Sequence, residues 1–250
     1  MAVPTQLLLP CWGQMASANH VLARLSDNDL ALLQVNLEPV ELAFKQSLEK
    51  PNEQIKFAYF PDDGIVSVVA VAREGLEVEV GIIGCDGMTA QAVVMGTDRS
   101  ANSTFVQVAG RAQRVDAQVL RDALRRSETL FRTLLAGVQS FIMQASHTAL
   151  ANGRSTISER LARWLLMAHD RLDGDGLPLT HEFLAVMLGV RRAGVTMAIQ
   201  QLEAAALVKT ERRLIVVTDR KGLETLARGI YGVAEAEQTR LTGWKSLKKR

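Results

Sequence analysis

The sequence predicts an α+β fold, made of an N-terminal antiparallel β-roll of the jelly-roll type, one long helix, and a C-terminal group of helices with a β-hairpin. Apolar residues alternate with period two from Val40 to Val115, and from Asp116 onward they recur with a helical period. The loop signal Asp173-Gly174-Asp175-Gly176 separates the last helices from the rest. With 250 residues, 48% of them hydrophobic, the chain is long enough for two modest domains.

The N-terminal end is predicted to be a leader followed by helix. Met1 to Pro10 is apolar but has no basic stretch, which argues against a signal peptide, and we expect a loose leader over residues 1–18. Asn19 to Leu33 has a helical pattern. Ser26-Asp27-Asn28-Asp29 is expected to break this helix or to cap a second one.

Short strands build the predicted roll. We expect them at residues 55–60, 65–71, 76–82 and 104–108, separated by turns rich in Gly, Asp and Pro. Glu77 and Glu79 alternate with valines, which is typical of a solvated strand edge, so we expect both carboxylates in water.

A long helix is predicted from about Ser127 to Ala151, after a shorter one from Asp116 to Leu124. Its apolar residues recur at spacings of 4 and 3, at Phe131, Leu135, Val138, Ile142, Ala145 and Ala149. This heptad pattern favours a parallel dimer, and the alternative is a helix that lies on its own roll. Asn152-Gly153 is expected to mark a break before a further helix from Ile157 to Leu172.

Two helices joined by a glycine turn follow. In the first, from Leu179 to Leu188, Thr180 is expected to be the N-cap, and the buried face consists of Phe183, Leu184, Met187 and Leu188. Gly189 permits the positive φ of the turn. The second helix, from about Arg191 to Ala206, has an apolar face of Val195, Ile199, Leu202 and Ala206. This pattern predicts a helix-turn-helix, whose second helix enters the major groove of DNA.

The opposite face of the second helix is small and poor in charge. It carries Ala193, Met197, Gln200 and Ala204, with Arg192 and Thr196 on its flank. Such a face suits contact with base edges: an arginine can pair with guanine, a glutamine with adenine, and methyl groups with thymine. The alternative is packing against a neighbouring element.

A β-hairpin with a basic tip is predicted after this helix, from Leu207–Lys209 and Leu214–Val217. Lys209, Arg212 and Arg213 of this wing would contact phosphates. The distribution of charge also favours contact with a polyanion. Lys and Arg outnumber Asp and Glu by 13 to 7 from residue 176 onward, whereas the ratio before it is 16 to 20. Gly222 to Arg240 is predicted to form one further helix.

Several classes of protein are not expected. The sequence has no nucleophile elbow, phosphate loop or metal-binding histidine spacing, so we expect neither an enzyme nor a bound metal or cofactor. Cys11 and Cys85 are too few for a disulfide framework, which favours a reducing, cytoplasmic location. No segment is apolar enough to cross a membrane. The four histidines stand alone in the sequence, at His20, His147, His169 and His181.

The order of roll, long helix and winged helix-turn-helix resembles the CRP/FNR superfamily of bacterial transcription regulators, over roughly residues 19–221. Leu188-Gly189-Val190-Arg191-Arg192 is similar to the family's turn into its recognition helix. The resemblance implies that Arg192 reads guanine and that Thr180 and Arg191 contact phosphates. Ala193 and Met197 stand where the family often has Glu and Arg, so the family's consensus half-site is not expected.

The resemblance also implies a cyclic-nucleotide-binding-like roll. Cyclic-AMP binders of the family carry a Gly-Glu pair and, about ten residues later, Arg-Ser or Arg-Thr. Here Asp86-Gly87-Met88-Thr89-Ala90-Gln91 lacks the glutamate, whereas Arg99-Ser100 is present. Loss of the charged acceptor costs about 1.5–3 kcal/mol, so we expect an unidentified signal or none. The alternative is a cyclic-nucleotide-responsive regulator that binds through Arg99-Ser100. Two distant cysteines also cannot hold the iron–sulfur cluster of the family's oxygen sensors.

We therefore expect a leader (1–18), a β-roll sensor domain (19–126), a dimerisation helix (127–152) and a winged helix-turn-helix domain with a C-terminal helix (153–250). The expected partners are double-stranded DNA with a near-palindromic site, a second copy of the chain and RNA polymerase; a small-molecule effector is one alternative for the signal, and no ligand at all is the other. The predicted DNA-contacting residues are Thr180, Arg191, Arg192, Ala193, Thr196, Met197, Gln200, Lys209, Arg212 and Arg213.

Overall fold

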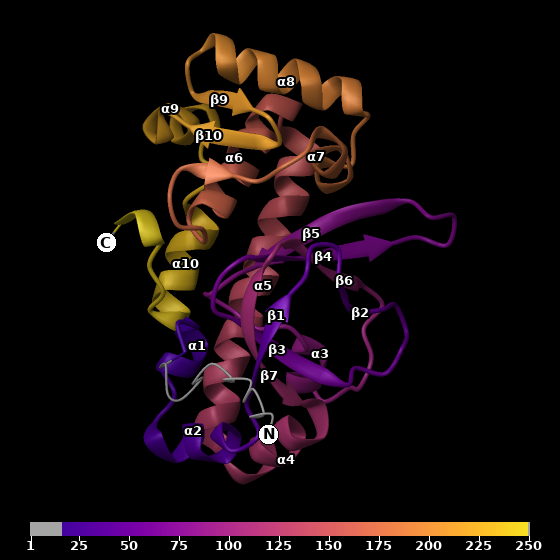
Figure 1. Cartoon of the computed structure of the whole chain (residues 1–250), viewed down its shortest axis with the longest axis vertical. Coiled ribbons are helices and arrows are strands. Elements are labelled where there is room, and N and C mark those ends of the chain that lie inside the picture. The colour runs from indigo at the N-terminus through magenta and orange to yellow at the C-terminus, as the bar shows by residue number, and fades with distance from the viewer. Residues whose placement is uncertain (1–16, 250) are drawn as a thin grey trace, which may run out of the picture.

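The computed structural model describes residues 17–249, so residues 1–16 of the expected leader lie outside the described part. Figure 1 shows a β-roll beside one long helix, with a second, mostly helical unit at one end of that helix. We call residues 38–116 the roll and residues 157–226 the head. The predicted α+β class, with its β-rich N-terminal part, long helix and C-terminal helix-turn-helix, is confirmed.

Two short helices precede the roll, α1 (His20–Ala23) and α2 (Asp27–Gln34). The Asn19 side chain caps α1, and the Ser26 side chain accepts a hydrogen bond from the Asp29 amide to cap α2. The predicted break at Ser26 is therefore confirmed.

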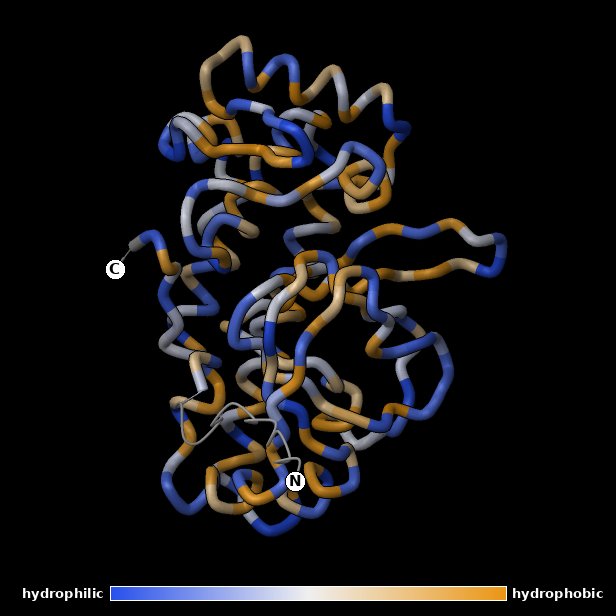
Figure 2. Tube along the Cα trace, viewed as in Figure 1, coloured by the Kyte–Doolittle hydropathy of each residue, from blue (hydrophilic) through white to orange (hydrophobic). Residues whose placement is uncertain are grey.

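The roll consists of two antiparallel sheets. One has the order β1 (Glu38–Leu42), β7 (Gly110–Asp116), β3 (Phe57–Pro61), and the other has the order β2 (Ser47–Glu49), β6 (Ser103–Val108), β4 (Ile65–Val71), β5 (Glu77–Ile83). The short helix α3 (Gln91–Val94) lies between β5 and β6 in the chain. The hairpin β4–β5 projects from the roll, and its trace is largely hydrophobic with a hydrophilic tip (Figure 2).

Helix α4 (Ala117–Arg126) leads into the long helix α5 (Glu128–Arg154), which lies along the roll. Leu130, Leu134 and Val138 form its buried face. The helix continues through Asn152-Gly153, so the predicted break is wrong there, and the chain leaves the helix at Ser155 instead. A glycine costs a helix only about 1 kcal/mol, which the packing of such a long helix can offset.

The predicted heptad pattern of α5 divides between two faces. Val138 is buried inside its own chain, whereas Leu135 and Ile142 are 40% and 46% exposed. The alternative that the helix lies on its own roll is thus correct for one face, and an apolar face remains open on the other.

The head consists of α6 (Ile157–His169), β8 (Gly176–Leu177), α7 (His181–Leu188), α8 (Arg192–Ala204), β9 (Val208–Glu211), β10 (Leu214–Val217) and α9 (Arg220–Leu226). Strands β8, β10 and β9 form a small antiparallel sheet. The head and the roll share one hydrophobic core. Ile65 and Ile82 of the roll belong to it, together with Leu165, Leu184 and Val195 of the head.

The single helix predicted over residues 222–240 is wrong. The chain forms α9, turns at Gly229 and Gly232, which both have positive φ, and then forms α10 (Val233–Thr242). Helix α10 leaves the head and packs along α5 (Figure 1), followed by the 3₁₀ turn η1 (Leu247–Lys249).

A buried ion pair joins the roll to the head. The Arg171 guanidinium, just after α6, donates to both carboxylate oxygens of Asp86, with N···O distances of 2.9 and 2.6 Å. The Gln238 amide of α10 donates to the same carboxylate at 2.5 Å, and the Trp244 ring lies 5.2 Å from the guanidinium. The roll, the head and the C-terminal segment therefore meet at one charged group.

The expectation that Glu79 is solvated is wrong. Its side chain is buried on β5, and its Oε1 accepts a hydrogen bond of 2.5 Å from the indole N–H of Trp164 in α6. Alternation with valine correctly predicts that Glu77 and Glu79 share one face of the strand, but it does not reveal that the head covers the face at Glu79. Glu77 is exposed, as expected.

Candidate nucleic-acid interface

Helix α7 and its turn have the predicted local geometry. The Thr180 hydroxyl accepts a hydrogen bond of 3.4 Å from the Phe183 amide and caps the helix. Gly189 ends it in the left-handed region, with φ of 58°. This residue lets the chain turn sharply into α8, which fixes how the two helices cross.

Helix α8 buries one face in the head. Val195, Ile199 and Leu202 are buried, as predicted. Ala206 is not part of that face, because the helix ends at Ala204 and Ala206 is exposed with φ of 57°. The predicted helix was therefore too long by two residues at its C-terminal end.

The opposite face of α8 is open to solvent. All four of its predicted residues are exposed: Ala193, Met197, Gln200 and Ala204. The alternative that this face packs against a neighbouring element is wrong for the described chain. Met197 is 62% exposed, so its side chain is accessible to a partner that docks on this face.

The N-terminal end of α8 carries two exposed arginines. Arg191 stands at the N-cap position without a side-chain cap, so the first amides of the helix can bind an anion. Arg192 forms an ion pair with Glu182 of α7, with 2.9 Å between Nη1 and Oε1. A hydrogen bond to its own backbone amide, together with the charge of Arg192, lowers the pKa of Glu182. No sequence pattern singles out Glu182, because its ion pair with Arg192 forms only across the turn.

Thr196 is the least accessible of the predicted residues on α8. It is half-buried, its hydroxyl donates to the Arg192 carbonyl oxygen at 3.2 Å, and it lies 3.2 Å from His181 Nδ1. The side chains of α7 and α8 are therefore connected at this point, and His181 has a structural contact there.

The wing is the antiparallel hairpin β9–β10. Glu211 pairs with Leu214, so Arg212 and Arg213 form a two-residue tip, and Arg213 has φ of 59°. Both arginines are exposed. Lys209 Nζ lies 3.0 Å from Glu211 Oε1, so one of the three phosphate contacts predicted for the wing is already paired within the strand.

A cleft of about 910 Å³ lies at one side of the contact between head and roll. Thr180, Arg192 and Arg213 line it from the head, and Phe44 and Lys45 line it from the roll. Phe183, predicted to lie inside the head, instead packs against the roll, with its ring centroid 5.2 Å from that of Phe44. Three of the predicted DNA-contacting residues, Thr180, Arg192 and Arg213, thus line this cleft.

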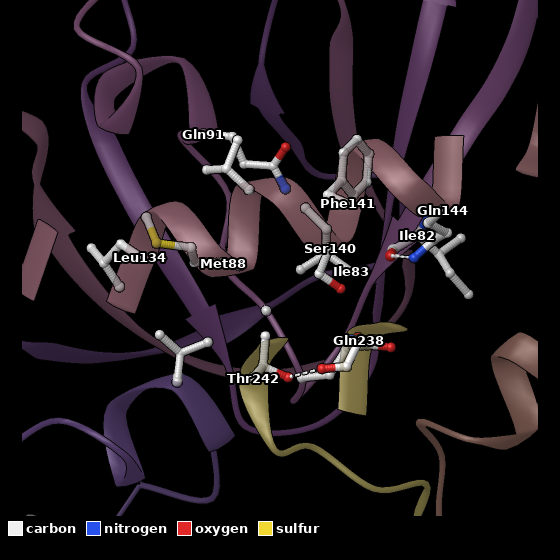
Figure 3. A pocket seen from close by; sticks show the side chains of 15 residues that line it. Ile82, Ile83, Met88, Gln91, Leu134, Ser140, Phe141, Gln144, Gln238 and Thr242 are labelled. Atoms are coloured by element: carbon white, nitrogen blue, oxygen red, sulfur yellow. Dashed lines mark hydrogen bonds between the residues drawn. The ribbon is translucent and has the colours of Figure 1, made fainter. Parts of the chain in front are cut away.

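The space between the roll and α5 is nearly filled. Figure 3 shows that side chains of β5, α5 and α10 converge there, and the remaining cavity has a volume of about 30 Å³. This volume suffices for about one water molecule, whereas small-molecule sites measure about 300–1,000 Å³. Asp86 is held by Arg171, so its carboxylate is not available to a ligand.

Arg99 and Ser100 do not line this cavity. The Arg99 side chain is 61% exposed and lies 3.6 Å from Asp98. Instead, the Glu49 carboxylate accepts a hydrogen bond of 2.6 Å from the amide of Ala90, next to α3, and burial raises its pKa. The amide at the start of α3 is thus already hydrogen-bonded to Glu49.

No helix in the described part is long and apolar enough to span a membrane. Among residues 17–249, no three His, Cys, Asp or Glu side chains gather in a way that could hold a metal ion. Three of the histidines have contacts within the chain: His20 with the Thr242 carbonyl oxygen, His169 with Asp175, and His181 with Thr196.

Comparisons with known proteins agree with this geometry. Residues 159–226 match the family model of the Crp-like helix-turn-helix domain. A protein from Eubacterium rectale assigned to the CRP/FNR family has a TM-score of 0.66 and 18% identity, with 84% of this chain and 98% of that chain covered. FixK2 from Bradyrhizobium japonicum has a TM-score of 0.63 and 18% identity, with 76% and 96% covered.

A third structure, the c-di-GMP responsive global regulator CLP of Xanthomonas campestris, has a TM-score of 0.62 and 13% identity, over 77% of this chain and 99% of that one. No curated protein matches the sequence. The resemblance found in the sequence is confirmed: residues 159–226 match a Crp-like helix-turn-helix domain, and the described chain has the fold of solved transcription regulators of the CRP/FNR family.

Proposed function

We propose that this protein is a homodimeric, sequence-specific transcription regulator that binds a near-palindromic DNA site. The exposed, charge-poor face of α8 carries this proposal, because Arg192 and the cationic wing tip flank it on the same head. A surface of this kind fits the major groove, with base contacts in the centre and phosphate contacts at the edges.

The chemistry of the face indicates how bases are read. Ala193 and Met197 offer methyl groups to thymine, and Gln200 can pair with adenine. Arg192 supplies the guanine contact, for which it must leave Glu182 or keep it as a second partner. Specificity then depends on thymine methyls and DNA shape more than on charged hydrogen bonds.

The outer face of α5 supports a dimer. Leu135, Ile142 and Leu150 are 40%, 46% and 48% exposed, and they recur at about two-turn intervals on the side away from the roll. A second copy of the same helix would cover this stripe with a heptad seam. Two paired heads would then present two recognition helices to successive major grooves, about 34 Å apart.

Two observations disfavour the cyclic-nucleotide alternative: the cavity beside α5 has a volume of only about 30 Å³, and Arg99 and Ser100, through which the nucleotide would bind, do not line it. We propose that the signal is another molecule, or that no small effector is bound. Contact with RNA polymerase is part of the proposal on the basis of the resemblance.

The DNA test is selection of duplexes from a random pool by the full chain, which should enrich a palindrome. Replacing Arg192 by Ala should weaken binding to the selected duplex by about 1–3 kcal/mol and relax the choice at one base pair of each half-site. Arg125→Ala, an exposed arginine on α4, is the matched control and should leave binding unchanged. Enrichment of no sequence, or an Arg192 variant that selects as the wild type does, contradicts the proposal.

The dimer test uses the α5 stripe. Leu135→Asp together with Ile142→Asp should give monomers in sedimentation, with an unchanged circular dichroism spectrum. Val35→Asp is the matched control, because Val35 is apolar and 87% exposed just after α2, and this variant should stay dimeric. A double variant that stays dimeric would assign the interface to another surface.

A further inference from the structure

A buried polar cluster lies between the roll and the head. Glu79 of β5, Ser67 of β4 and Gln107 of β6 supply it from the roll, and Trp164 of α6 and Met187 of α7 cover it from the head. Trp164 donates to Glu79, and the Ser67 hydroxyl donates to Gln107 and lies 3.6 Å from the Met187 sulfur. The three polar side chains of the roll are at most 3% exposed.

The cluster is incompletely satisfied. Glu79 Oε2 and Gln107 Nε2 are buried without a hydrogen-bond partner. A buried polar atom without a partner carries the cost of its lost hydration. Water would reach both atoms if the head moved away, so this part of the contact favours separation. The apolar contacts around it, such as Phe44 with Phe183, favour docking.

The charged groups that face Glu79 are already engaged elsewhere. The Arg163 side chain of α6 donates to the Ile230 carbonyl oxygen and to Thr148, and Arg171 holds Asp86. Their charges attract the carboxylate of Glu79 only from a distance. Burial therefore dominates and raises the pKa of Glu79 to about 8, against the opposing effects of Ser67, Trp164 and the two arginines.

We propose that Glu79 is a proton-dependent latch: while its carboxyl group is neutral the head stays docked on the roll, and ionisation of that group favours release of the head. This device goes beyond DNA binding and does not depend on it. Its ligand is a proton, and its two states differ in whether water reaches the Glu79 cluster.

The direction of the pH effect follows from linkage. In the released state Glu79 is in water with its ordinary pKa of 4.5, and in the docked state its pKa is about 8. Below pH 4.5 both states are protonated, and above pH 8 both are ionised, so docking changes little with pH there. Between these values the ratio of released to docked heads should rise by up to about ten-fold per pH unit. The pKa of Asp86, at the neighbouring junction, is lowered, so Asp86 stays ionised throughout this window.

The test measures the distance between roll and head in the full chain by fluorescence energy transfer. Dyes are placed at Glu41→Cys in β1 and Ala204→Cys in α8, both exposed, in a Cys11→Ser, Cys85→Ala background. Labelled chain is mixed with excess unlabelled chain, so that transfer between subunits is negligible. Transfer efficiency should change progressively from pH 5 to pH 8 and level off above it.

Glu79→Gln keeps the shape and removes the charge, so its transfer efficiency should stay at the docked value at every pH. Glu77→Gln, exposed on the same strand, is the matched control and should behave as the wild type. If Glu79→Gln fails to fold by circular dichroism, Glu79→Leu replaces it as a second uncharged variant. A wild-type signal that does not change with pH, or an uncharged variant that retains the change, overturns the latch. Because no DNA is present, either outcome leaves the proposed function untouched.

Discussion

Replacing Asp86 by Ala removes the carboxylate at which roll, head and C-terminal segment meet. The side chains of Arg171 and Asp86 are 2% and 4% exposed, so neither charge is compensated by water. The variant leaves the Arg171 guanidinium buried, with the Met167 carbonyl oxygen and the Trp244 ring as its remaining partners. Breaking one side of a buried pair costs about 3–5 kcal/mol, more than a typical surface substitution.

The assay is thermal and urea unfolding at pH 7, followed by circular dichroism. For a chain of this size each kcal/mol lowers the melting temperature by about 2–4 °C, so the expected decrease exceeds the error of the measurement. Asp86→Leu combined with Arg171→Met removes both charges and should recover much of the loss. Asp63→Ala, which breaks the exposed pair of Asp63 with Arg111, is the control and should change far less.

The Asp86–Arg171 pair also predicts that the stability of the protein decreases in acid. Burial alone would raise the pKa of Asp86, but the charge and hydrogen bonds of Arg171, with Gln238 and the Gly84 amide, lower it overall. Its contribution to stability is therefore present above its ordinary pKa of 3.8 and is lost as the pH falls through the lowered value. The difference between wild type and Asp86→Ala should shrink only in that acid range. A loss under about 1 kcal/mol at pH 7 would refute the reasoning.

Two further predictions concern the head. Gly189→Ala should destabilise the protein by more than about 1 kcal/mol, because of its left-handed φ and because a Cβ there would lie 3.2 Å from the side chain of Val78 in the roll. Gly174→Ala is the control for the backbone effect alone, because Gly174 has φ of 70° and open space around it. Equal losses of stability for the two variants in urea unfolding would show that the contact with Val78 contributes nothing. Thr156→Ala should cost about 1 kcal/mol by removing the capping box with Glu159 at the start of α6. An unchanged unfolding midpoint would contradict that role.

Most of the fold follows from local patterns. The strands β3 to β6 are apolar, β-branched or alternating over enough residues to be recognised, and the turn at Gly189 is set by one glycine. The exposed face of α8 was also predictable, because a helix with Val195, Ile199 and Leu202 on one side must present Met197 and its neighbours on the other.

The errors arise where a distant segment decides the environment. The sequence around Glu79 is the same whether water or Trp164 lies beside it, so only the docking of the head makes it buried. An apolar Phe183 fits the interior of the head as well as a contact with the roll, and only the placement of the roll brings it against Phe44. The pair of Arg192 with Glu182 likewise forms across a turn whose exact angle no periodicity describes.

The path of α10 also bears on how the protein is made. Translation delivers residues 233–249 after the roll, α5 and the head, and domains begin to fold while the chain is still emerging. Until that segment arrives, Gln238 and Trp244 are missing from the Asp86–Arg171 pair, and one wall of the cavity beside α5 is absent. The junction between roll and head is thus completed only after both of these parts have been synthesised.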